Sequence, residues 1–278
     1  MNDLPIAQPS GRLHGKSALL IGASRGIGAQ TAKVLARSGA KVVLAARDGH
    51  ALAAVAAEIQ TAGCEARFMV VDVGDERSIE SLVQYAVDQF GRLDIAFNNA
   101  TDGPTPQPLA EMSAADFDRA IRTNIRGTFL GMKFQVRAML ASGGGSIINM
   151  ASVAGVQGVA NLAGYVTGKA GIIALTKVAA LDYADQGIRV NVLAPGPILT
   201  HHLEAAGEQG QQQAAMATPM RRLGSSQEVA RTVLWLGSDD SSFITGAIIP
   251  IDGGQLAGTK PEHMYRPGQT MPDTSDHL

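Results

Sequence analysis

Hydrophobic residues in this chain gather in short runs that alternate with longer segments of helical spacing. Seven apolar runs predict strands, at Ser17–Ala23, Lys41–Ala46, Arg67–Asp72, Leu93–Asn98, Gly145–Ala151, Ile188–Leu193 and Ala247–Ile251. Between them, apolar residues at helical spacing predict helices over Gly26–Ser38, Ala51–Ala62, Glu76–Phe90, Ala114–Ala141, Ala163–Ala184 and Ser226–Leu236. Apolar strands that alternate with helices are typical of a parallel sheet covered on both faces. We therefore expect an α/β fold with a doubly wound, seven-stranded parallel sheet, and ligands bound beyond the carboxyl ends of its strands.

One domain is expected over residues 15–258, because α/β chains of 278 residues commonly bury a single core. Residues 1–14 and 259–278 fall outside the alternation and are predicted to be tails. Residues 199–220 interrupt it between the sixth strand and the last helix, with a Gln-rich middle flanked by Ala and Met. We expect a mobile lid over the substrate there, with a solvated connector as the alternative.

Charge and composition exclude several classes of function. The net charge is -2 and the basic residues are scattered, so nucleic acid is not an expected partner. No apolar run approaches the roughly 18 residues of a membrane span and no targeting signal precedes the first strand, so we expect a cytoplasmic protein with no membrane contact. The single cysteine, Cys64, cannot form an internal disulfide. No metal site is expected: His201 and His202 are the alternative, but adjacent residues seldom chelate one ion well.

A glycine-rich segment joins the first strand to the first helix. Glycines at 22, 26 and 28 would let the backbone turn tightly and approach a pyrophosphate, while the helix N-terminus supplies N–H groups. Placed after a first strand, this spacing indicates a Rossmann-type dinucleotide site, the alternative being an ordinary glycine-rich turn. The residues expected to hold the cofactor here are Gly22, Ser24, Arg25, Gly26, Ile27 and Gly28.

The end of the second strand favours NADP over NAD. An acidic residue that would hold the ribose 2′-hydroxyl of NAD is expected there, but Ala46 occupies the position and Arg47 follows it. Arg47 and Arg25 are placed to clamp a 2′-phosphate. NAD stays possible, since the arginines may be solvated and Asp48, whose other role is to cap the second helix, can turn back to the ribose.

Two further strand ends carry candidate cofactor residues. Asp72 and Val73 follow the third strand and are expected near the adenine ring, although Asp72 can instead cap the next helix. Asn98 and Ala100, at the end of the fourth strand, are expected at the switch point of the sheet, with a strand-bridging role as the alternative for the asparagines.

Tyr165 and Lys169 form a candidate proton-transfer pair. They stand four residues apart in a predicted helix and so share one face. A neighbouring ammonium favours the ionised form of a phenol, which otherwise has a pKa near 10, and so brings it closer to use as a general acid/base. Ser152 ends the fifth strand and could hydrogen-bond a substrate oxygen at the same rim of the sheet. Asn124 lies inside a predicted helix, where asparagine is usually a solvated or packing residue.

Together these motifs resemble the short-chain dehydrogenase/reductase family over about residues 13–254. The resemblance is carried by Gly22, Gly26 and Gly28, by Asn98-Asn99-Ala100, by Asn124, Ser152, Tyr165 and Lys169, and by Pro195-Gly196. It implies that Tyr165 transfers the proton, Lys169 holds the nicotinamide ribose, Ser152 orients the substrate oxygen and Asn124 anchors a water relay. It also implies that Pro195, Gly196, Ile198 and Thr200 contact the nicotinamide end of the cofactor.

The resemblance further implies a homotetramer formed through the helices over 114–141 and 163–184 and through the last strand with the helix that precedes it. Gly164, Gly168 and Gly171 would permit close packing there, although packing within one subunit explains them equally well. Two residues depart from the family pattern: Ile21 replaces its usual Thr, and Thr101 replaces the last Gly of Asn-Asn-Ala-Gly. Glycine normally lets this loop pass close to the cofactor, and Thr101 adds a Cβ there, which would change the cofactor affinity or the local geometry.

The expected function is hydride transfer between a nicotinamide cofactor, NADP favoured and NAD possible, and a neutral ketone or secondary alcohol. The alternative is a non-catalytic sensor of the cofactor with the same fold. Ser152, Tyr165, Val153 and Gln157 are expected to contact the substrate, in a mostly apolar pocket that also includes Thr101, Ala154 and Leu162.

Overall fold

The main element of the structure is a seven-stranded parallel sheet with the order β3-β2-β1-β4-β5-β6-β9. The computed structural model describes residues 11–103 and 105–258, so residues 1–10 of the tail predicted over 1–14, and the tail predicted over 259–278, lie outside the described residues. Of the remaining residues 11–14, Leu13 is fully buried and its backbone N–H donates to the carbonyl oxygen of Ser38 at 2.9 Å. The sheet strands are β1 (Ser17–Ile21), β2 (Lys41–Ala46), β3 (Ala66–Val70), β4 (Ile95–Asn98), β5 (Gly145–Met150), β6 (Ile188–Pro195) and β9 (Ile248–Ile251). The predicted Rossmann-type α/β fold is confirmed.

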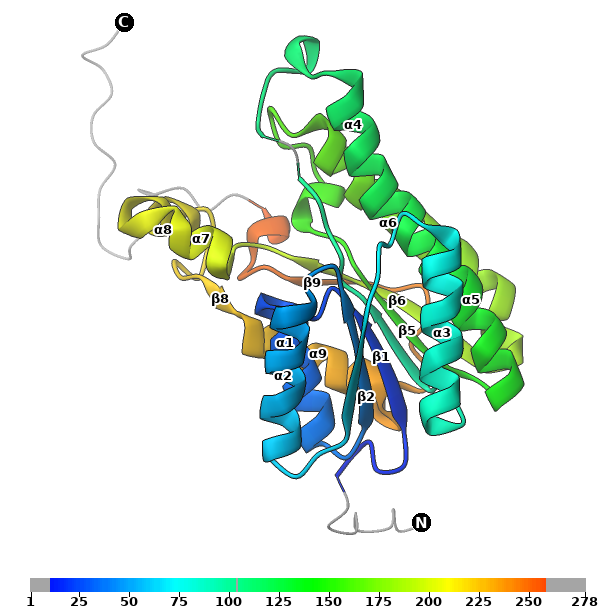
Figure 1. Cartoon of the computed structure of the whole chain (residues 1–278). Coiled ribbons are helices and arrows are strands. Elements are labelled where there is room, and N and C mark those ends of the chain that lie inside the picture. Colours follow the sequence, from blue (N-terminus) through cyan, green and yellow to red (C-terminus); the bar gives the residue numbers. More distant parts are fainter. Residues whose placement is uncertain (1–10, 104, 259–278) are drawn as a thin grey trace, which may run out of the picture.

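Helices cover both faces of this sheet in two layers (Figure 1). One layer contains α1, α2 and α9, with α1 packed along α9, and the other contains α3, α5 and α6, with α4 packed on α6. The helices are α1 (Gly26–Arg37), α2 (Gly49–Thr61), α3 (Glu76–Phe90), α4 (Ala114–Ile121), α5 (Gly127–Ser142), α6 (Ala163–Tyr183), α7 (His201–Ala205), α8 (Gly207–Met216) and α9 (Ser226–Gly237). Within the described ranges, no helix is long and apolar enough to cross a membrane.

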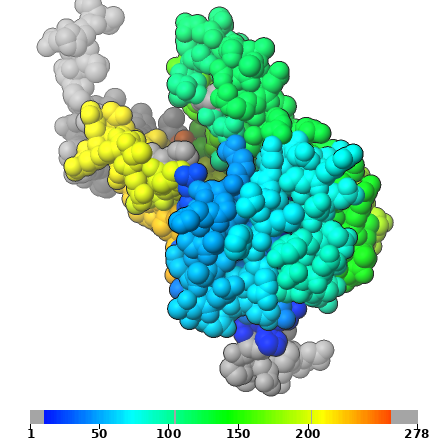
Figure 2. Space-filling model, in the orientation of Figure 1, coloured from blue at the N-terminus to red at the C-terminus, as the bar shows by residue number. Residues whose placement is uncertain are grey.

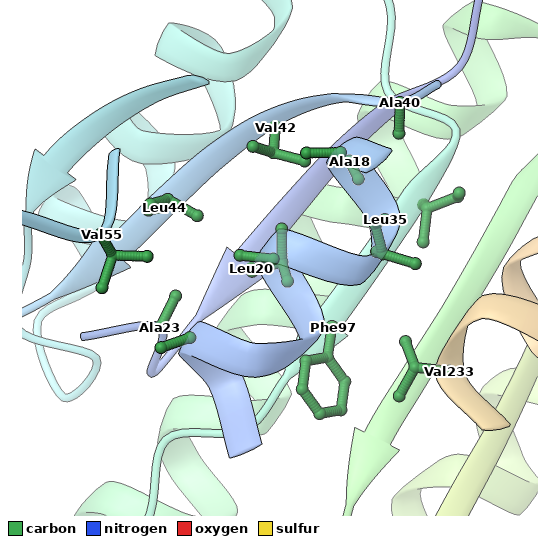
Figure 3. Close-up of a cluster of buried hydrophobic side chains, with 14 of the residues drawn as sticks. Ala18, Leu20, Ala23, Leu35, Ala40, Val42, Leu44, Val55, Phe97 and Val233 are labelled. Carbon is green, nitrogen blue, oxygen red and sulfur yellow. The ribbon is translucent and has the colours of Figure 1, made fainter. Parts of the chain in front are cut away.

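Alternating side chains of the central strands supply both layers of the core. On β1, Leu20 faces the α1 side and Leu19 the α3 side, and both are fully buried. Figure 3 shows Leu20, Leu44 and Phe97 of the sheet meeting Leu35 of α1 and Val233 of α9. Burying an aliphatic or aromatic side chain of this size stabilises the fold by about 1.5–3 kcal/mol, so the uninterrupted apolar runs of the sequence correspond to strands enclosed on two faces.

The helix predicted as one segment over Ala114–Ala141 is interrupted. A π-helical turn at Arg122–Arg126 separates α4 from α5, and Asn124 lies in it with its side chain completely buried. The wider turn has no signature in hydrophobic spacing, because apolar residues continue at helical intervals on both sides of it. Such π-turns occur often at functional sites.

The segment predicted as a lid contains α7 and α8. Two short strands, β7 (Ile198–Leu199) and β8 (Gly224–Ser225), pair at its base, which joins the two ends of the segment to one another. The helices α7 and α8 stand beside the ends of the sheet strands (Figure 1). The segment is therefore structured, although whether it moves as a lid stays a prediction.

Candidate active site

A cleft of about 650 Å³ opens where the strands of the main sheet end. Its walls come from residues at or just after the ends of β1, β2, β3, β4, β5 and β6, from α6, from the π-helical turn and from the start of α7. Figure 2 shows the surface hollowed between the yellow α7–α8 segment and the green α4. Of the predicted site residues, the cleft contains Gly22, Ser24, Arg25, Gly26, Ile27, Arg47, Asp72, Val73, Ala100, Ser152, Tyr165, Lys169, Pro195, Gly196, Ile198 and Thr200.

A second hollow, of about 730 Å³, lies between α3 and α5. It is lined mostly by charged side chains, two of which form an ion pair, with Lys133 Nζ 2.6 Å from Glu76 Oε1. None of the predicted site residues line it, so we place the active site in the cleft at the strand ends.

The glycine turn brings the first strand, the first helix and the fourth strand together. Gly22 has φ +82°, and a Cβ on it would stand 2.7 Å from the backbone nitrogen of Ala100. A Cβ on Gly28 would collide with the carbonyl oxygen of Gly22. At the N-cap of α1, Arg25 makes no side-chain hydrogen bond to the helix, so the N-terminal N–H groups face the cleft without a side-chain cap.

The end of the cleft at β2 carries two exposed arginines. Arg25 and Arg47 both line it, and among the described residues neither is recorded in an ion pair. Asp48 Oδ1 accepts a hydrogen bond from the backbone N–H of Ala51 at 3.0 Å, so it caps α2, as one of the two interpretations of this residue predicted. The local surplus of positive charge fits a phosphate group.

Asp72 is held by a partner that sequence reasoning missed. Its carboxylate accepts hydrogen bonds from Arg122, with 2.8 Å between Arg122 Nη2 and Asp72 Oδ2, and from the backbone N–H of Gly74 at 2.9 Å. The Arg122 guanidinium, first, and then the Gly74 N–H hold the pKa of this carboxyl below its usual range. The alternative that Asp72 caps the next helix is wrong, because Asp75 caps α3 by accepting from Ser78 N–H.

The two asparagines at the end of β4, Asn98 and Asn99, point their side chains in different directions. Asn99 lines the cleft, and its Nδ2 donates to the carbonyl oxygen of Gly22 at 2.9 Å. The side chain of Asn98 instead turns into the core, where it exchanges hydrogen bonds with Gln135 and donates to Asn149 of β5 at 2.9 Å. Asn98 thus bridges strands through its side chain, and any contact with a cofactor is left to its backbone.

Tyr165 and Lys169 lie on the same face of α6 and both line the cleft. The Lys169 ammonium is 5.5 Å from the centre of the Tyr165 ring. Burial raises the pKa of the Tyr165 phenol, and its hydrogen bond with Ser152 offsets part of this rise. The lowering of this pKa expected from Lys169 is not found: desolvation of the phenolate raises the pKa, and the group that offsets part of the rise is Ser152.

Lys169 is buried more completely than lysine usually is, with 1 % of its surface exposed. Within the part of the chain that the structure describes, its one recorded hydrogen bond runs from Nζ to the carbonyl oxygen of Met150 at 3.0 Å. Burial lowers the pKa of its ammonium to about 7. An ammonium has three donors, so Lys169 keeps hydrogen-bonding capacity toward the cleft.

Ser152 follows β5 and stands at the same rim of the sheet, as predicted. Its Oγ accepts from the backbone N–H of Ala154 at 3.2 Å and lies 3.5 Å from the carbonyl oxygen of Pro195. These contacts fix the hydroxyl beside Tyr165 between two strand ends.

Asn124 lies behind these residues and does not line the cleft. Its Nδ2 donates to the carbonyl oxygens of Asp102, at 2.7 Å, and Ala120, at 2.9 Å, while its Oδ1 accepts from Thr101 Oγ1 at 3.0 Å. The side chain therefore connects the loop after β4 to the π-turn. A role of Asn124 in a water relay stays a prediction.

The predicted substrate residues are only partly brought together. Ser152, Tyr165 and Thr101 line the cleft, whereas Val153, Gln157, Ala154 and Leu162 do not. Val153 and Ala154 form a short 3₁₀ turn after β5, and both are buried. Their proximity to Ser152 in sequence suggested the pocket, but the turn directs them into the protein.

Other cleft residues were not predicted. Asp102 and Gly103 follow a predicted strand, and the rule that ligands bind at strand ends would have indicated them. Thr123 belongs to the π-turn inside a predicted helix, and His201 to the segment expected as a lid. For Thr123 no signal was available in the sequence.

The residues present fit a nicotinamide dinucleotide. The helix α1 presents N–H groups without a side-chain cap, and Gly22 and Gly28 leave no room for side chains at the turn. Lys169 lines the cleft with one recorded hydrogen bond among the described residues, so its ammonium has donors left for a ligand. Arg25 and Arg47 add positive charge to the lining of the cleft.

Comparisons with known proteins agree with this geometry. Residues 22–255 match a family model described as "Enoyl-(Acyl carrier protein) reductase". The chain is 40% identical to cyclohexanol dehydrogenase of an Acinetobacter species over 244 residues, which cover 88% of this chain and 96% of that protein. It is 36% identical to levodione reductase of Leifsonia aquatica over 261 residues, with 90% and 98% covered. A crystal structure of levodione reductase matches with a TM-score of 0.86, at 35% identity, over 89% of this chain and 100% of that one.

Proposed function

Because the chain belongs to the short-chain dehydrogenase/reductase family and is thus a nicotinamide-dependent oxidoreductase, we propose that it interconverts a neutral ketone and a secondary alcohol with NADP, with Tyr165 as general acid/base. The observation that carries the proposal is the convergence of Tyr165, Ser152 and Lys169 at one end of a cleft whose other end carries Arg25 and Arg47.

The chain's own residues supply the proton transfer. When bound, the nicotinamide supplies or accepts the hydride. During reduction Tyr165 Oη gives its proton to the carbonyl oxygen, and during oxidation it takes the proton from the alcohol. Ser152 Oγ lies beside Tyr165 and holds the reacting oxygen by a hydrogen bond.

Lys169 and the glycine turn would hold the cofactor. The buried Lys169 ammonium offers donors to the ribose hydroxyls, and the uncapped start of α1 offers N–H groups to the pyrophosphate. Pro195, Gly196, Ile198 and Thr200 line the nicotinamide end of the cleft. The family resemblance implies the same division of roles.

The preference for NADP rests on charge at the end of β2. Arg25 and Arg47 flank the cleft, and Asp48, which could compete for a ribose hydroxyl, is engaged as the cap of α2. Two guanidinium groups attract a 2′-phosphate and gain little from an unmodified ribose.

The substrate class is a cyclic secondary alcohol or its ketone. A relative that shares 40% of its sequence with this chain is named for cyclohexanol. Within the described part of the cleft, Asp102 is the acidic group at the catalytic end, and Arg119 pairs with it at 3.2 Å. A neutral substrate therefore suits this end better than a carboxylate or phosphate.

Replacement of Tyr165 by Phe tests the function. The Tyr165→Phe variant keeps the ring and loses only the hydroxyl, so we expect turnover to fall by at least about 10³-fold while NADPH still binds. Turnover is measured at 340 nm with cyclohexanol and cyclohexanone, and binding by the fluorescence of NADPH. Unchanged turnover in this variant would overturn the acid/base assignment.

The wild-type titration separates the enzyme from the non-catalytic sensor. We expect NADPH to bind at least tenfold more tightly than NADH, with turnover of alcohols or ketones. Binding without turnover of any alcohol or ketone favours the sensor, and preference for NADH overturns the assignment of NADP.

A homotetramer is part of the same proposal. Phe129 and Leu140 on α5 and Val178 and Leu181 on α6 are exposed, and Leu181 shows 83% of its surface. Apolar side chains gathered on two neighbouring helices indicate a subunit interface.

A further inference from the structure

Thr101 brings a side chain with a hydroxyl group to the lining of the cleft, at a position where the family pattern has glycine. It lies in the loop after β4, is exposed and lines the cleft beside Asp102 and Gly103. The family's catalytic groups therefore do not account for this hydroxyl, and what it does follows from its hydrogen bonds.

The direction of the hydrogen bond between Thr101 and Asn124 is fixed by the other contacts of Asn124. Asn124 Nδ2 faces two carbonyl oxygens, of Asp102 and Ala120, and a carbonyl oxygen can only accept. The amide oxygen of Asn124 must then face Thr101, and it too can only accept. The Thr101 hydroxyl is therefore the donor, and its proton is committed to Asn124.

A hydroxyl whose proton is already donated in a hydrogen bond can offer only its lone pairs to a further partner. Toward the cleft, Thr101 Oγ1 is consequently an acceptor and not a donor. It discriminates in a way that a glycine could not, because it favours a ligand group that carries a proton, such as a hydroxyl.

The loop that carries Thr101 is held in place relative to Tyr165. Asn99 binds the carbonyl oxygen of Gly22, and Asp102 pairs with Arg119 of α4 at 3.2 Å. A Cβ on Gly103 would be 3.6 Å from Cδ2 of Tyr165, so the loop lies against the ring of the acid/base. An acceptor held this firmly pays little ordering entropy when it binds a substrate.

We propose that Thr101 Oγ1 accepts a hydrogen bond from a second hydroxyl of the substrate, so that the enzyme prefers diols and hydroxyketones to alcohols with a single hydroxyl. The inference rests on the proposed function, since it assigns the substrate class of the same site. Thr101 is thereby a specificity-determining residue for the reacting ring.

Matched substrates and variants test this inference. The substrates are cyclohexanol, the 1,2-, 1,3- and 1,4-cyclohexanediols and the monomethyl ether of each diol, which keeps the second oxygen but has no proton on it. In the wild type we expect at least one diol to exceed its ether in kcat/KM by about tenfold, the value of a well-placed hydrogen bond. Thr101→Val, which is close in shape but has no hydroxyl, should bring that ratio to the factor of about two that two equivalent hydroxyls give by statistics.

Thr101→Ser keeps the hydroxyl and is expected to retain the preference. Loss of the Asn124 contact in Thr101→Val lowers the rate with diol and ether alike, so the ratio isolates the contact with the substrate. A ratio near two in the wild type, or one equal in wild type and Thr101→Val, overturns the inference while turnover of cyclohexanol still supports the proposed function. No turnover of any alcohol or ketone overturns the proposed function itself, and the inference with it.

Discussion

Lys169 is a nearly fully buried amine that also lines the cleft. An amine that is almost fully buried, with one recorded acceptor in the described structure, loses its proton more readily than an exposed one. Burial of this ammonium lowers the stability of the folded protein, and a ligand that offers further hydrogen-bond acceptors offsets part of that loss. Activity and stability are thereby linked at one side chain.

The stability of the cofactor-free protein should rise with pH above neutrality. The pKa of Lys169 is about 7 in the folded state against an ordinary 10.5. Between these values the unfolded chain holds a proton that the folded chain has released, so the folded state gains as pH rises, by at most about 1.4 kcal/mol per pH unit. Below pH 7 both states hold the proton and the slope from this group vanishes.

Urea unfolding between pH 6 and pH 10 measures this effect. Lys169→Met keeps an unbranched side chain that is one atom shorter and removes the titrating group, so the stability difference between the two proteins should change across the window and be flat below it. Parallel stability curves for wild type and Lys169→Met would contradict the prediction.

Arg47 offers a second prediction at the same scale. If it binds the 2′-phosphate, Arg47→Ala should raise the Kd for NADPH by about tenfold or more and leave that for NADH nearly unchanged, because a charged hydrogen bond is worth about 1.5–3 kcal/mol. Fluorescence titration gives both constants. Arg37→Ala, which removes an arginine from the C-terminal end of α1 and outside the lining of the cleft, is the control. An equal loss for both cofactors would refute the phosphate contact.

At the scale of elements, the packing of α6 on the π-turn decides where the catalytic groups stand. Gly164, Gly168 and Gly171 face Ala120, Asn124 and Ile125, each in contact with the position where a Cβ would be. The close packing that these glycines permit is therefore realised within one subunit. Tyr165 and Lys169 flank Gly168 along the helix, so this contact sets their distance from the loop after β4.

Gly168→Ala tests that contact. The new Cβ would be 2.9 Å from Cβ of Asn124, which forces α6 or the π-turn to move. Overpacking typically costs about 1–3 kcal/mol, more than the gain in helix propensity of about 1 kcal/mol. We expect lower stability and at least a tenfold lower kcat. Gly158→Ala is the control, because nothing lies within 4 Å of a Cβ there. Full activity of Gly168→Ala would contradict the positioning role of this packing.

At the scale of the whole molecule, α5 and α6 expose apolar side chains to solvent in the single chain. Water-exposed leucine and phenylalanine on adjacent helices are typical of association between copies. The two helices also carry or adjoin the catalytic groups, so association would stabilise the site from behind.

Leu181→Glu is expected to weaken the oligomer. A carboxylate at a residue that is 83% exposed in one subunit costs little in the isolated chain but is unfavourable inside an apolar interface. Sedimentation or light scattering should show smaller species than in the wild type. Leu109→Glu, at a leucine 77% exposed outside α5 and α6, is the control. A wild type that is already monomeric would refute the tetramer.

The sequence by itself determined the sheet, its layers and many of the residues that line the cleft. Alternation of apolar strands and helices is a local property, and each strand end lies at a predictable edge of a parallel sheet. The glycine turn, Arg47, Ser152, Tyr165 and Lys169 were found because their positions relative to strand ends or along one helix are fixed by spacing alone.

Tertiary structure decided what depends on contacts between distant segments. The pairing of Arg122 with Asp72 and the inward turn of Asn98 involve partners 37 to 51 residues apart. The π-turn at Asn124 is a helix geometry without a hydrophobic signature. Val153 seemed a substrate residue by proximity to Ser152, but a 3₁₀ turn buries it. The burial that lowers the pKa of Lys169 and raises that of Tyr165 exists only once α6 packs against the sheet, because desolvation is a property of the folded surroundings.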